Sequence, residues 1–512
     1  MLVKTHGCAL HGVDAIGITV EVHIDSGFKF YLVGLPDNAV KESQRRIESA
    51  LKSIGLKMPG KRITVNLAPA DIRKEGSAYD LGIALGILAA SGQVKYNQFG
   101  QYIIMGELSL DGSLHPLKGS LSMALLALNK GYRGIVLPEA SAREASVLTE
   151  LEVFGAKNLS QVLRHFNGEE KMIPIKPEYN TIHQHLNYTD EVDFSDVVGQ
   201  EGVKRAMEIA AAGGHNILMI GPPGAGKTML AKRLPGILPK LELDESIETT
   251  KIHSVAGLVN QNMSTLVQRP FRHPHHTVSD VALVGGGGNP QPGEISLAHN
   301  GVLFLDELPE FKRSALEVLR QPMEDRKITI SRAKFAVDFP ANFMLVASMN
   351  PCPCGFFNHP DKKCICPDRS IQRYLSRVSG PLLDRIDLHI EVSPVPIREF
   401  GKGRKNDSSI EIRARVIAAR QRQRYRLRNS NIKTNVEMSR GLINEHCELD
   451  LSASNLLHQA VDRLGLSARA YDKILKVSRT IADLAASESI QCEHIAEAVQ
   501  YRSLDRSIWF SS

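Results

Sequence analysis

Two kinds of hydrophobic pattern follow one another along the first third of the chain. Residues 18–24, ITVEVHI, alternate between apolar and polar side chains, which predicts a half-buried strand. In residues 36–55 the apolar positions recur at helical spacing, with Pro36 near the start of the pattern and Gly55 near its end. Further strand-like and helix-like stretches alternate after these. We therefore expect residues 1–168 to form one α/β domain.

The pattern changes twice beyond this first domain. Residues 169–192 show no periodicity and contain two prolines, which is typical of a linker. Residues 193–401 again alternate between apolar strands and helical stretches, which predicts a second α/β domain. In residues 402–512 a polar connector precedes apolar positions at helical spacing, without strand-like runs. We expect this last part to be helical.

Composition and charge describe an ordinary soluble protein. The 512 residues exceed what one hydrophobic core usually holds, and 43% are hydrophobic and 23% charged. The net charge of +6 permits a nucleic-acid partner without requiring one. The first residues show no apolar signal region, and no apolar run reaches the roughly 18 residues of a membrane span. With only seven cysteines as well, we expect a cytoplasmic protein.

The stretch HNILMIGPPGAGKTML contains the pattern G-x-x-x-x-G-K-T between a short apolar strand and a helical segment. Glycines let backbone N–H groups surround phosphates, and the helix N-terminus adds a positive dipole end. Lys227 would reach the β- and γ-phosphates of ATP, and the Thr228 hydroxyl would contact Mg²⁺. A glycine-rich turn arising by chance is disfavoured by the strand before it and the helix after it. The predicted nucleotide-binding residues are Gly221, Pro222, Pro223, Gly224, Ala225, Gly226, Lys227, Thr228 and Met229.

Two later strands end in polar residues that suit the same chemistry. GVLFLDE ends in Asp306, which would hold Mg²⁺, and Glu307, which would orient or deprotonate the attacking water. A strand that merely ends in acidic residues is the alternative, which the preceding phosphate loop weakens. NFMLVASMN ends in Asn350, which would hold the attacking water. Two arginines would contact nucleotide, Arg385 as an arginine finger before a strand and Arg469 at a helix start.

Each lone arginine also has a plainer interpretation as a surface ion pair, and Arg377 is the second candidate for the finger.

Four of the seven cysteines lie in residues 350–367, NPCPCGFFNHPDKKCICP. In a reducing compartment a structural Zn²⁺ site is the favoured interpretation, held by Cys352, Cys354, Cys364 and Cys366. His359 would be a substitute ligand. The C-x-C spacing is tighter than the usual C-x₂-C, and a loop of reduced cysteines without metal remains the alternative.

With these elements in order, the chain resembles the AAA+ ATPases, in the branch of magnesium-chelatase ATPase subunits and MCM helicases. FRHPHHTVSDVALVGGGGNPQPGEISLAHNGVLFLDELPEF and ASMNPCPCG are similar to the ComM/YifB family of magnesium chelatase-like proteins. The resemblance covers essentially the whole chain. It implies a homohexameric ring with ATP sites between subunits. It also implies Asn350 as sensor 1, Arg385 as the finger acting in trans and Arg469 as sensor 2.

The resemblance further implies two hairpins that point into the ring pore, within residues 269–294 and 326–340. The second also alternates like a hairpin, with Arg332 and Lys334 near its turn. These two cations would contact DNA. His275 and His276 of the first hairpin would form a turn or contact DNA rather than bind a metal, because no cysteine or acidic residue lies at ligand spacing. A solvated hairpin tip is the plainer interpretation of the cations. Residues 412–436 contain many arginines and no acid, which suits DNA, solvent or a neighbouring subunit.

Residues 1–168 also resemble the protease domain of Lon, whose serine lies in K-D-G-P-S-A-G and whose lysine lies in G-G-L-K-E-K. The corresponding positions are Ala78, with Ser77 one place early, and Leu121. Without a lysine to take its proton a serine is not an activated nucleophile, so we expect no peptidase activity. Lys118 and Ser77 leave a shifted dyad open. By analogy this domain would assist oligomerisation and guide DNA.

Three functions follow from these features. The first is an ATP-driven DNA motor, which the ComM resemblance specifies as branch migration of recombination intermediates in natural transformation. The partner would be branched or single-stranded DNA, and no membrane is involved. The second is the motor subunit of a metal chelatase, and the third is an ATP-dependent protease or unfoldase. The Lon-like domain and the basic segment argue against the second.

Overall fold

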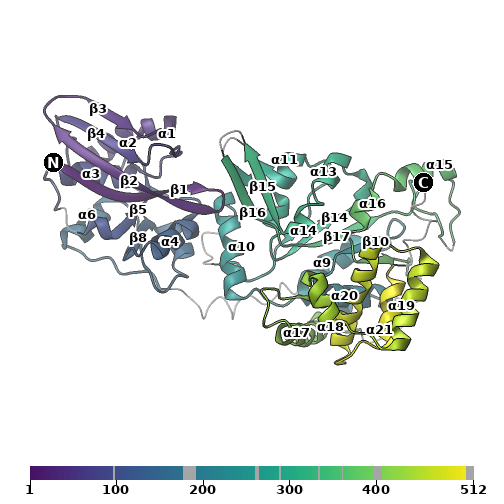
Figure 1. The fold of residues 1–512 in the computed structure, drawn as a ribbon. Coiled ribbons are helices and arrows are strands. Elements are labelled where there is room, and N and C mark those ends of the chain that lie inside the picture. Colours follow the sequence, from purple (N-terminus) through teal and green to yellow (C-terminus); the bar gives the residue numbers. More distant parts are fainter. Residues whose placement is uncertain are drawn as a thin grey trace.

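The computed structural model describes residues 1–95, 98–176, 192–259, 265–287, 290–332, 335–359, 361–395 and 406–502. An N-terminal α/β domain stands beside a central α/β domain, which carries the C-terminal helices (Figure 1). In these ranges no helix is long and apolar enough to cross a membrane. The larger part of the predicted linker 169–192 falls outside the described residues. Its first part packs on the N-terminal domain, where the Ile175 N–H donates to the Val153 carbonyl at 2.8 Å.

The N-terminal domain is built on one mixed sheet with the strand order β3-β4-β2-β1-β5-β8-β9. The strands are β1 (Leu2–His11), β2 (Asp14–Asp25), β3 (Phe30–Val33), β4 (Arg62–Ala68), β5 (Tyr102–Ile104), β8 (Gly134–Pro138) and β9 (Glu152–Ala156). The predicted strand at 18–24 lies within β2, whose residues pair with β1 and β4. A separate hairpin joins β6 (Glu107–Leu108) to β7 (Leu114–His115).

Helices cover this sheet. They are α1 (Asn38–Lys41), α2 (Ser43–Ser53), α3 (Asp80–Ala90), α4 (Ser120–Asn129), α5 (Glu139–Ala145) and α6 (Leu159–Asn167), with a 3₁₀ turn at Phe99–Gln101. Apart from Asp80 at its start, helix α3 is apolar, and it is fully buried against β1 and β2. Gly86 permits this approach, because a Cβ there would lie 2.6 Å from Cγ2 of Val22. The helical pattern predicted in 36–55 forms α1 and α2.

The central domain is built on a parallel sheet with the order β11-β14-β17-β10-β18. The strands are β10 (Ile217–Ile220), β11 (Phe271–Arg272), β14 (Val302–Leu305), β17 (Met344–Met349) and β18 (Leu388–Glu391). Their residues are almost all buried, as expected where helices cover both faces of a parallel sheet. The order places the first strand, β10, between β17, which Asn350 follows, and β18, which ends in Glu391.

Helices and two short hairpins surround this sheet. The helices are α8 (Glu201–Gly213), α9 (Lys227–Ile237), α10 (Leu243–Ala256), α11 (Asp280–Val284), α12 (Glu294–Leu297), α13 (Arg313–Glu317), α14 (Pro322–Asp325), α15 (Asp368–Leu375) and α16 (Gly380–Leu383), with 3₁₀ turns at Phe194–Asp196 and Leu308–Glu310. One hairpin pairs β12 (Gly285–Gly286) with β13 (Gln291–Pro292). The other pairs β15 (Lys327–Arg332) with β16 (Phe335–Pro340). The hairpin predicted within 326–340 is confirmed.

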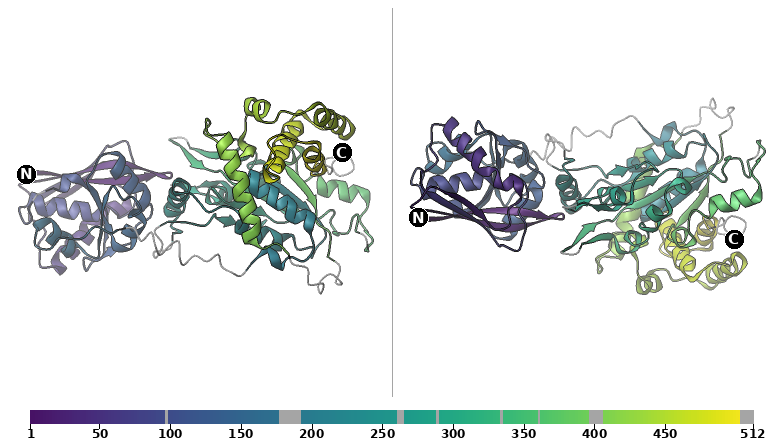
Figure 2. Two further views of the ribbon diagram at one scale, coloured as in Figure 1. Left: turned by 90° about the horizontal axis from the view of Figure 1, so that it is seen from below. Right: turned by 90° about the horizontal axis from the view of Figure 1, so that it is seen from above.

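The C-terminal segment is helical, as predicted. Its helices are α17 (Ser409–Arg426), α18 (Arg440–His446), α19 (Leu451–Leu464), α20 (Ala468–Leu484) and α21 (Cys492–Gln500), with a 3₁₀ turn at Asn435–Glu437. Helix α17 packs along α8 and α9 of the central domain, and α20 packs on α8 (Figure 2). These helices share one hydrophobic core with the strand β10 and the helix that follows it.

Helix α10 joins the two large domains. It packs on α4, where the Gly119 N–H donates to the Ser254 carbonyl at 3.2 Å. Lys251 forms an ion pair with Asp14, with 2.7 Å between Nζ and Oδ1. Val13, at the turn between β1 and β2, is buried in the same cluster as β15 and β16. The N-terminal domain therefore contacts both α10 and the larger hairpin (Figure 1).

Candidate ATPase site

Three strand ends meet at the carboxyl edge of the central sheet. Strand β10 lies next to β17, and β17 lies next to β14, so the residues that follow these strands gather at one place. Leu305 pairs with Ala347, and Ile220 pairs with Met349. Ligands of open parallel sheets bind at this edge, where neighbouring strands lead to loops on opposite sides. The predicted phosphate loop, Asp306 and Asn350 are thereby brought together.

The phosphate loop joins β10 directly to α9. Gly224 and Gly226 have φ angles of 80° and 87°, in the left-handed region that favours glycine. Lys227 is the first residue of α9, so the N–H groups of the loop and the helix N-terminus face the same space as its side chain. Met229 lies in the first turn of α9 and is 39% exposed. This arrangement fits a triphosphate.

The ammonium of Lys227 is held by oxygen atoms. Its Nζ lies 2.6 Å from the Gly221 carbonyl, 3.1 Å from the Pro222 carbonyl and 3.0 Å from Oδ1 of Asn350. Burial lowers the pKa of Lys227, and the charges of Asp306 and Glu307 oppose this shift. Phosphate oxygens would replace these partners with stronger, charge-assisted hydrogen bonds.

Asp306 is bound by two hydroxyl groups. Thr228 donates to its Oδ2 at 2.6 Å, and Ser348 donates to its Oδ1. Carboxylate and hydroxyl oxygens are the hard ligands that Mg²⁺ prefers, so Thr228 and Asp306 would hold the Mg²⁺ that accompanies ATP. Ser348 was not predicted from the sequence. It lies two residues before Asn350 and therefore on the same face of β17, which is the signal that would have revealed it.

Glu307 occupies an unusual backbone conformation directly after Asp306. Its φ of 56° and ψ of 49° are left-handed, which costs free energy for a residue with a Cβ and is concentrated at functional sites. Its side chain is 54% exposed. The Oε2 atom lies 3.7 Å from Nδ1 of His276, in the loop after β11. The sequence did not reveal this contact between two predicted site residues.

The two predicted arginines lie at the opposite edge of the sheet. Both line a pocket of about 420 Å³ together with Asn216, Gly301 and Phe343, which directly precede β10, β14 and β17. The lining carries more arginine and lysine than aspartate and glutamate. Neither arginine therefore lies beside the phosphate loop of its own chain. An excess of positive charge in such a pocket suits a polyphosphate.

Arg385 is already paired within the chain. Its Nη2 lies 2.8 Å from Oε1 of Glu324, and its Nη1 donates to the Pro381 carbonyl at 2.8 Å, leaving the side chain 12% exposed. Arg469 is exposed at the start of α20. Arg377, the second candidate for the finger, is 51% exposed and pairs with Glu310 at 3.0 Å. Arg385 thus differs from Arg377 by its place in the basic pocket.

The arginine-rich segment braces the C-terminal helices against the central domain. Arg426 lies 2.7 Å from the buried carboxylate of Asp483, and Arg420 donates to the Ala211 carbonyl at 2.7 Å. Burial lowers the pKa of Arg420 to about 9. Arg413, Arg415, Arg422 and Arg424 likewise reach Gly236, Glu208, Asp483 and Glu242. These contacts lie within the chain and give the segment a structural role that none of the three interpretations from the sequence had included.

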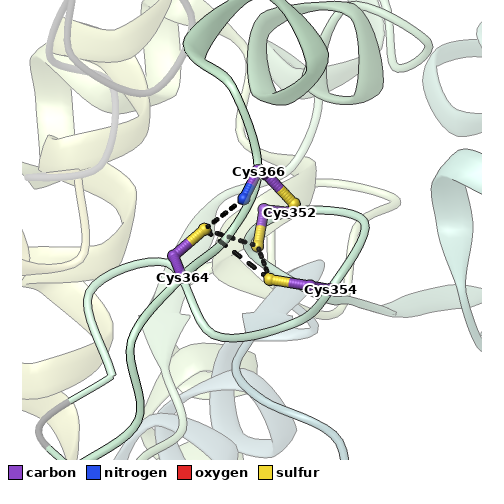
Figure 3. A group of neighbouring side chains, drawn as sticks. All are labelled: Cys352, Cys354, Cys364 and Cys366. Atoms are coloured by element: carbon purple, nitrogen blue, oxygen red, sulfur yellow. Dashed lines mark hydrogen bonds between the residues drawn. The ribbon is translucent and has the colours of Figure 1, made fainter.

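The four cysteines of the insertion converge on one point (Figure 3). The Sγ of Cys352 lies 3.4 Å from that of Cys354 and 3.7 Å from that of Cys364, and all four Sγ atoms lie within 4.8 Å of one another. Four sulfurs around a tetrahedral Zn²⁺ are separated by roughly 3.8 Å. His359 instead accepts the N–H groups of Asp361 and Lys362 at Nδ1.

One thiol of the cluster has a lowered pKa, whereas the pKa values of the other three are raised, in Cys352 and Cys366 chiefly by burial. Burial raises the pKa of Cys354, but the N–H groups of Ile365 and Phe356 outweigh it and bring the pKa to about 6. The thiolate is the form that binds metals. The same loop touches the phosphate loop, because a Cβ on Gly355 would lie 2.4 Å from Cδ of Pro223. The cluster therefore stands beside the nucleotide site.

The predicted DNA contacts are only partly described. Arg332 ends β15, and Lys334 lies outside the described residues. The predicted hairpin within 269–294 contains α11 and the short β12–β13 pair, and its histidines precede them in a loop. His275 is exposed and His276 half-buried, and neither lies in a group of potential metal ligands within the described ranges.

The two Lon positions in the N-terminal domain carry apolar side chains. Leu121, at the lysine position, is fully buried in α4, and Ala78 is half-buried against the core. Lys118 extends toward the central domain, since a Cβ on Gly257 would lie 3.1 Å from its Nζ. Among the described residues neither the Ser77 hydroxyl nor the Lys118 ammonium makes a hydrogen bond. The lack of peptidase activity stays a prediction.

The fold and the site define a P-loop ATPase of the AAA+ class, of the magnesium-chelatase type. Residues 193–400 match the family "Magnesium chelatase, subunit ChlI", and residues 20–141 and 406–502 match the families of this subunit and of its C-terminal part. Competence protein ComM of Haemophilus influenzae is 46% identical over 501 residues, covering 97% of this chain and 96% of ComM.

The YifB protein of Salmonella typhimurium is 44% identical over 509 residues, covering 99% of this chain and 98% of YifB. The chain belongs to the ComM/YifB family. It is also similar to Lon protease 2 of Bacillus subtilis, with 27% identity over 187 residues, 31% of this chain and 33% of the protease. The family implies the use of nucleotide and Mg²⁺, which the phosphate loop and Asp306 fit.

Proposed function

We propose that the protein is an ATP-driven homohexameric DNA motor that migrates branches in recombination intermediates during natural transformation. The observation that carries the proposal is the separation of the catalytic groups. Lys227, Asp306 and Asn350 lie at one edge of the sheet, whereas Arg385 and Arg469 line a basic pocket at the other. The site is incomplete in one chain, and the arginines of a neighbouring subunit would complete it.

The proposed hydrolysis uses groups at both edges. Water attacks the γ-phosphorus, its proton passes to Glu307, and the bond to the bridging oxygen of ADP breaks. Lys227 and the loop N–H groups stabilise the charge on the phosphate oxygens, and Mg²⁺ supplies further charge neutralisation when bound. The arginines from the next subunit then make turnover depend on assembly, as expected of a closed ring.

The DNA substrate is proposed from the similarity to a competence protein and from the hairpin β15–β16. The test is an ATPase and binding assay of the purified protein with linear, forked and four-way DNA. We expect the four-way substrate to accelerate hydrolysis most. The proposal is rejected if the purified protein neither binds branched DNA nor hydrolyses ATP faster in its presence.

The match to magnesium chelatase subunits favours a second candidate, a motor subunit that inserts a metal ion into a porphyrin with partner proteins. An ATPase response to a porphyrin-binding partner, without a response to DNA, would favour this candidate.

We also propose that the four cysteines hold one structural Zn²⁺, supported by the short separations of their sulfur atoms.

A further inference from the structure

The carboxylate of Asp387 joins the last strand of the central sheet to the C-terminal helices. Asp387 directly precedes β18 and is 4% exposed. Its Oδ1 lies 2.8 Å from Nζ of Lys473 on α20, and its Oδ2 accepts the Asn216 N–H at 2.8 Å. Burial raises the pKa of Asp387, but the charge of Lys473 and the hydrogen bonds to the carboxylate outweigh it and bring the pKa to about 2. Asp387 is therefore ionised although it is shielded from solvent.

This ion pair connects the two segments that carry the proposed trans-acting arginines. Arg385 is two residues before Asp387. Arg469 is four residues before Lys473, one turn earlier on α20, so these two side chains lie on the same face of the helix. All four residues line the basic pocket. The pairing of Asp387 with Lys473 therefore fixes how far the start of α20 lies from the segment of Arg385.

The backbone beside Arg385 is held at a second point, by Asn216. The side-chain amide of Asn216 donates to the Arg385 carbonyl at 3.3 Å, and its backbone carbonyl accepts the Asp387 N–H at 3.0 Å. Asn216 directly precedes β10, and its Oδ1 accepts the N–H of Leu345 in β17 at 2.8 Å. The segment from Arg385 to Asp387 is thus anchored to two strands of the sheet, and Lys473 is anchored to that segment.

A buried ion pair of this kind contributes little net stability, because two charges taken out of water lose hydration that their attraction barely returns. The removal of one partner, by contrast, leaves an uncompensated buried charge, so the two groups are strongly held at one separation. The other lysine of α20, Lys476, donates to the Val436 carbonyl at 2.9 Å instead. The pair is therefore better suited to fixing a distance than to stabilising the fold.

We infer that Asp387 and Lys473 are positioning residues that set the separation of Arg385 and Arg469 for the nucleotide bound by the neighbouring subunit. The inference rests on the proposed function, in which these arginines complete the neighbour's site. It adds two groups that act through the arginines rather than on the nucleotide itself. Their loss lowers kcat more than ATP affinity, because it displaces the charges that stabilise the transferring phosphate.

The test uses the full-length double variant Asp387→Asn with Lys473→Met, which removes the ion pair without leaving an unpaired buried charge. Asparagine still accepts the Asn216 N–H through its side-chain oxygen. We expect kcat to fall by about ten- to a hundredfold, the cost of a displacement of about 1 Å, with ATP affinity nearly unchanged. Lys204→Met, which removes a buried lysine of α8 outside the pocket, is the matched control and should keep the wild-type kcat. A wild-type kcat in the double variant would overturn the inference.

Mixed rings separate positioning from a structural defect. In these rings the double variant is combined with Lys227→Ala subunits, which have intact arginines, or with Arg385→Ala subunits, which have an intact phosphate loop. Lys227→Ala should restore hydrolysis and Arg385→Ala should not, since Arg385→Ala and the double variant are defective on the same side of the interface. Restoration by Arg385→Ala, or by neither partner after confirmed subunit exchange, would overturn the inference.

The failure of this inference is distinguishable from that of the proposed function. The reference is the mixture of Lys227→Ala with Arg385→Ala. If this mixture stays inactive, the arginines do not act across subunits, and that arrangement is rejected together with the inference. If it regains hydrolysis but the double variant does not follow Arg385→Ala, the inference alone fails. If the double variant follows Arg385→Ala while DNA accelerates none of the proteins, the DNA motor is rejected and the positioning role is supported.

Discussion

The ammonium of Lys227 and the side-chain oxygen of Asn350 lie 3.0 Å apart, although 123 residues separate them in the chain. Lys227 lies at the start of α9, where we predict that it binds phosphate, whereas Asn350 reaches the same space from the end of β17. We expect Asn350→Ala to lower kcat by about 10²-fold or more while ATP affinity changes little, because its amide acts on water in the transition state. Steady-state kinetics and nucleotide titration separate the two quantities.

Lys227→Ala should behave differently, since its charge serves both binding and turnover. We expect it to lose ATP affinity as well as hydrolysis. If Lys227→Ala and Asn350→Ala lost ATP affinity equally, the separate roles of Lys227 in binding and Asn350 in turnover would be contradicted. Asn429→Ala, at an exposed position beyond α17, is the control.

Glu307→Gln keeps the shape of the side chain and removes its basicity. Turnover should fall by about 10²- to 10⁴-fold, the usual contribution of a general base, and ATP binding should persist. Rapid-quench and filter-binding assays measure the two properties. Retention of wild-type turnover would exclude Glu307 as the base.

The position of Arg385 in the basic pocket predicts complementation between two inactive proteins. Arg385→Ala and Lys227→Ala subunits should each be inactive alone. In mixed rings, about one neighbouring pair in four combines an intact phosphate loop with an intact arginine, so about a quarter of the wild-type rate should return. A mixture that stays inactive after confirmed subunit exchange would show that Arg385 does not act across subunits.

Loss of the cysteine cluster should reach the nucleotide site through the contact of Gly355 with Pro223. We expect about one zinc per chain by elemental analysis, and Cys352→Ser should remove it. The melting temperature should fall by roughly 5 °C or more and ATP turnover should slow, because a bound metal would order a loop that has few apolar residues. Cys492→Ser, outside the cluster, should change neither. Absence of zinc, with all thiols titratable, would refute the site.

His215 predicts a dependence of stability on pH. Burial lowers its pKa to about 4, and its Nε2 lies 2.8 Å from the Thr480 hydroxyl of α20. The unfolded chain, with an ordinary histidine pKa, binds a proton that the folded chain rejects. The contribution of His215 to the free energy of unfolding is therefore present above about pH 6.5 and is lost as the pH falls toward 4. Between pH 7 and 5 the loss should be about 2 kcal/mol.

Thermal unfolding of wild type and His215→Gln at both pH values measures this contribution. The variant should show a smaller pH dependence, since glutamine does not titrate. His458→Gln, at an exposed position, should retain the wild-type dependence. If the stability of His215→Gln depended on pH as strongly as that of the wild type, the loss of stability at low pH could not be assigned to His215.

Local sequence patterns were sufficient for the groups at the carboxyl edge of the sheet. The phosphate loop, Asp306 and Asn350 each follow an apolar strand directly, and parallel strands bring such positions together whatever the rest of the fold. Alternation predicted the hairpin of β15 and β16, in agreement with the family resemblance, and helical spacing predicted the helical C-terminal segment. The cysteines could be grouped because they are close in sequence.

Contacts between distant segments could not be predicted in this way. The partners of the arginine-rich segment, among them Asp483 and Glu242, give no local signal that they face it. The pairing of His276 with Glu307 requires knowing that β11 lies beside β14. The contact of Asp14 with Lys251 depends on how two domains dock, which no periodic pattern specifies.

The docking of α10 on α4 also limits which side chains the N-terminal domain can hold at the positions of the Lon catalytic residues. Leu121 is buried within α4, and its N–H donates to Glu144 at 2.8 Å. The position that holds the lysine in Lon therefore lies inside the helix that packs on α10 of the central domain. A lysine placed there would introduce a charge beneath that contact. Ala78→Ser with Leu121→Lys should therefore disturb the ATPase assembly without restoring a peptidase. We therefore predict that packing around Leu121, and not only the two missing side chains, keeps this domain from acting as a peptidase.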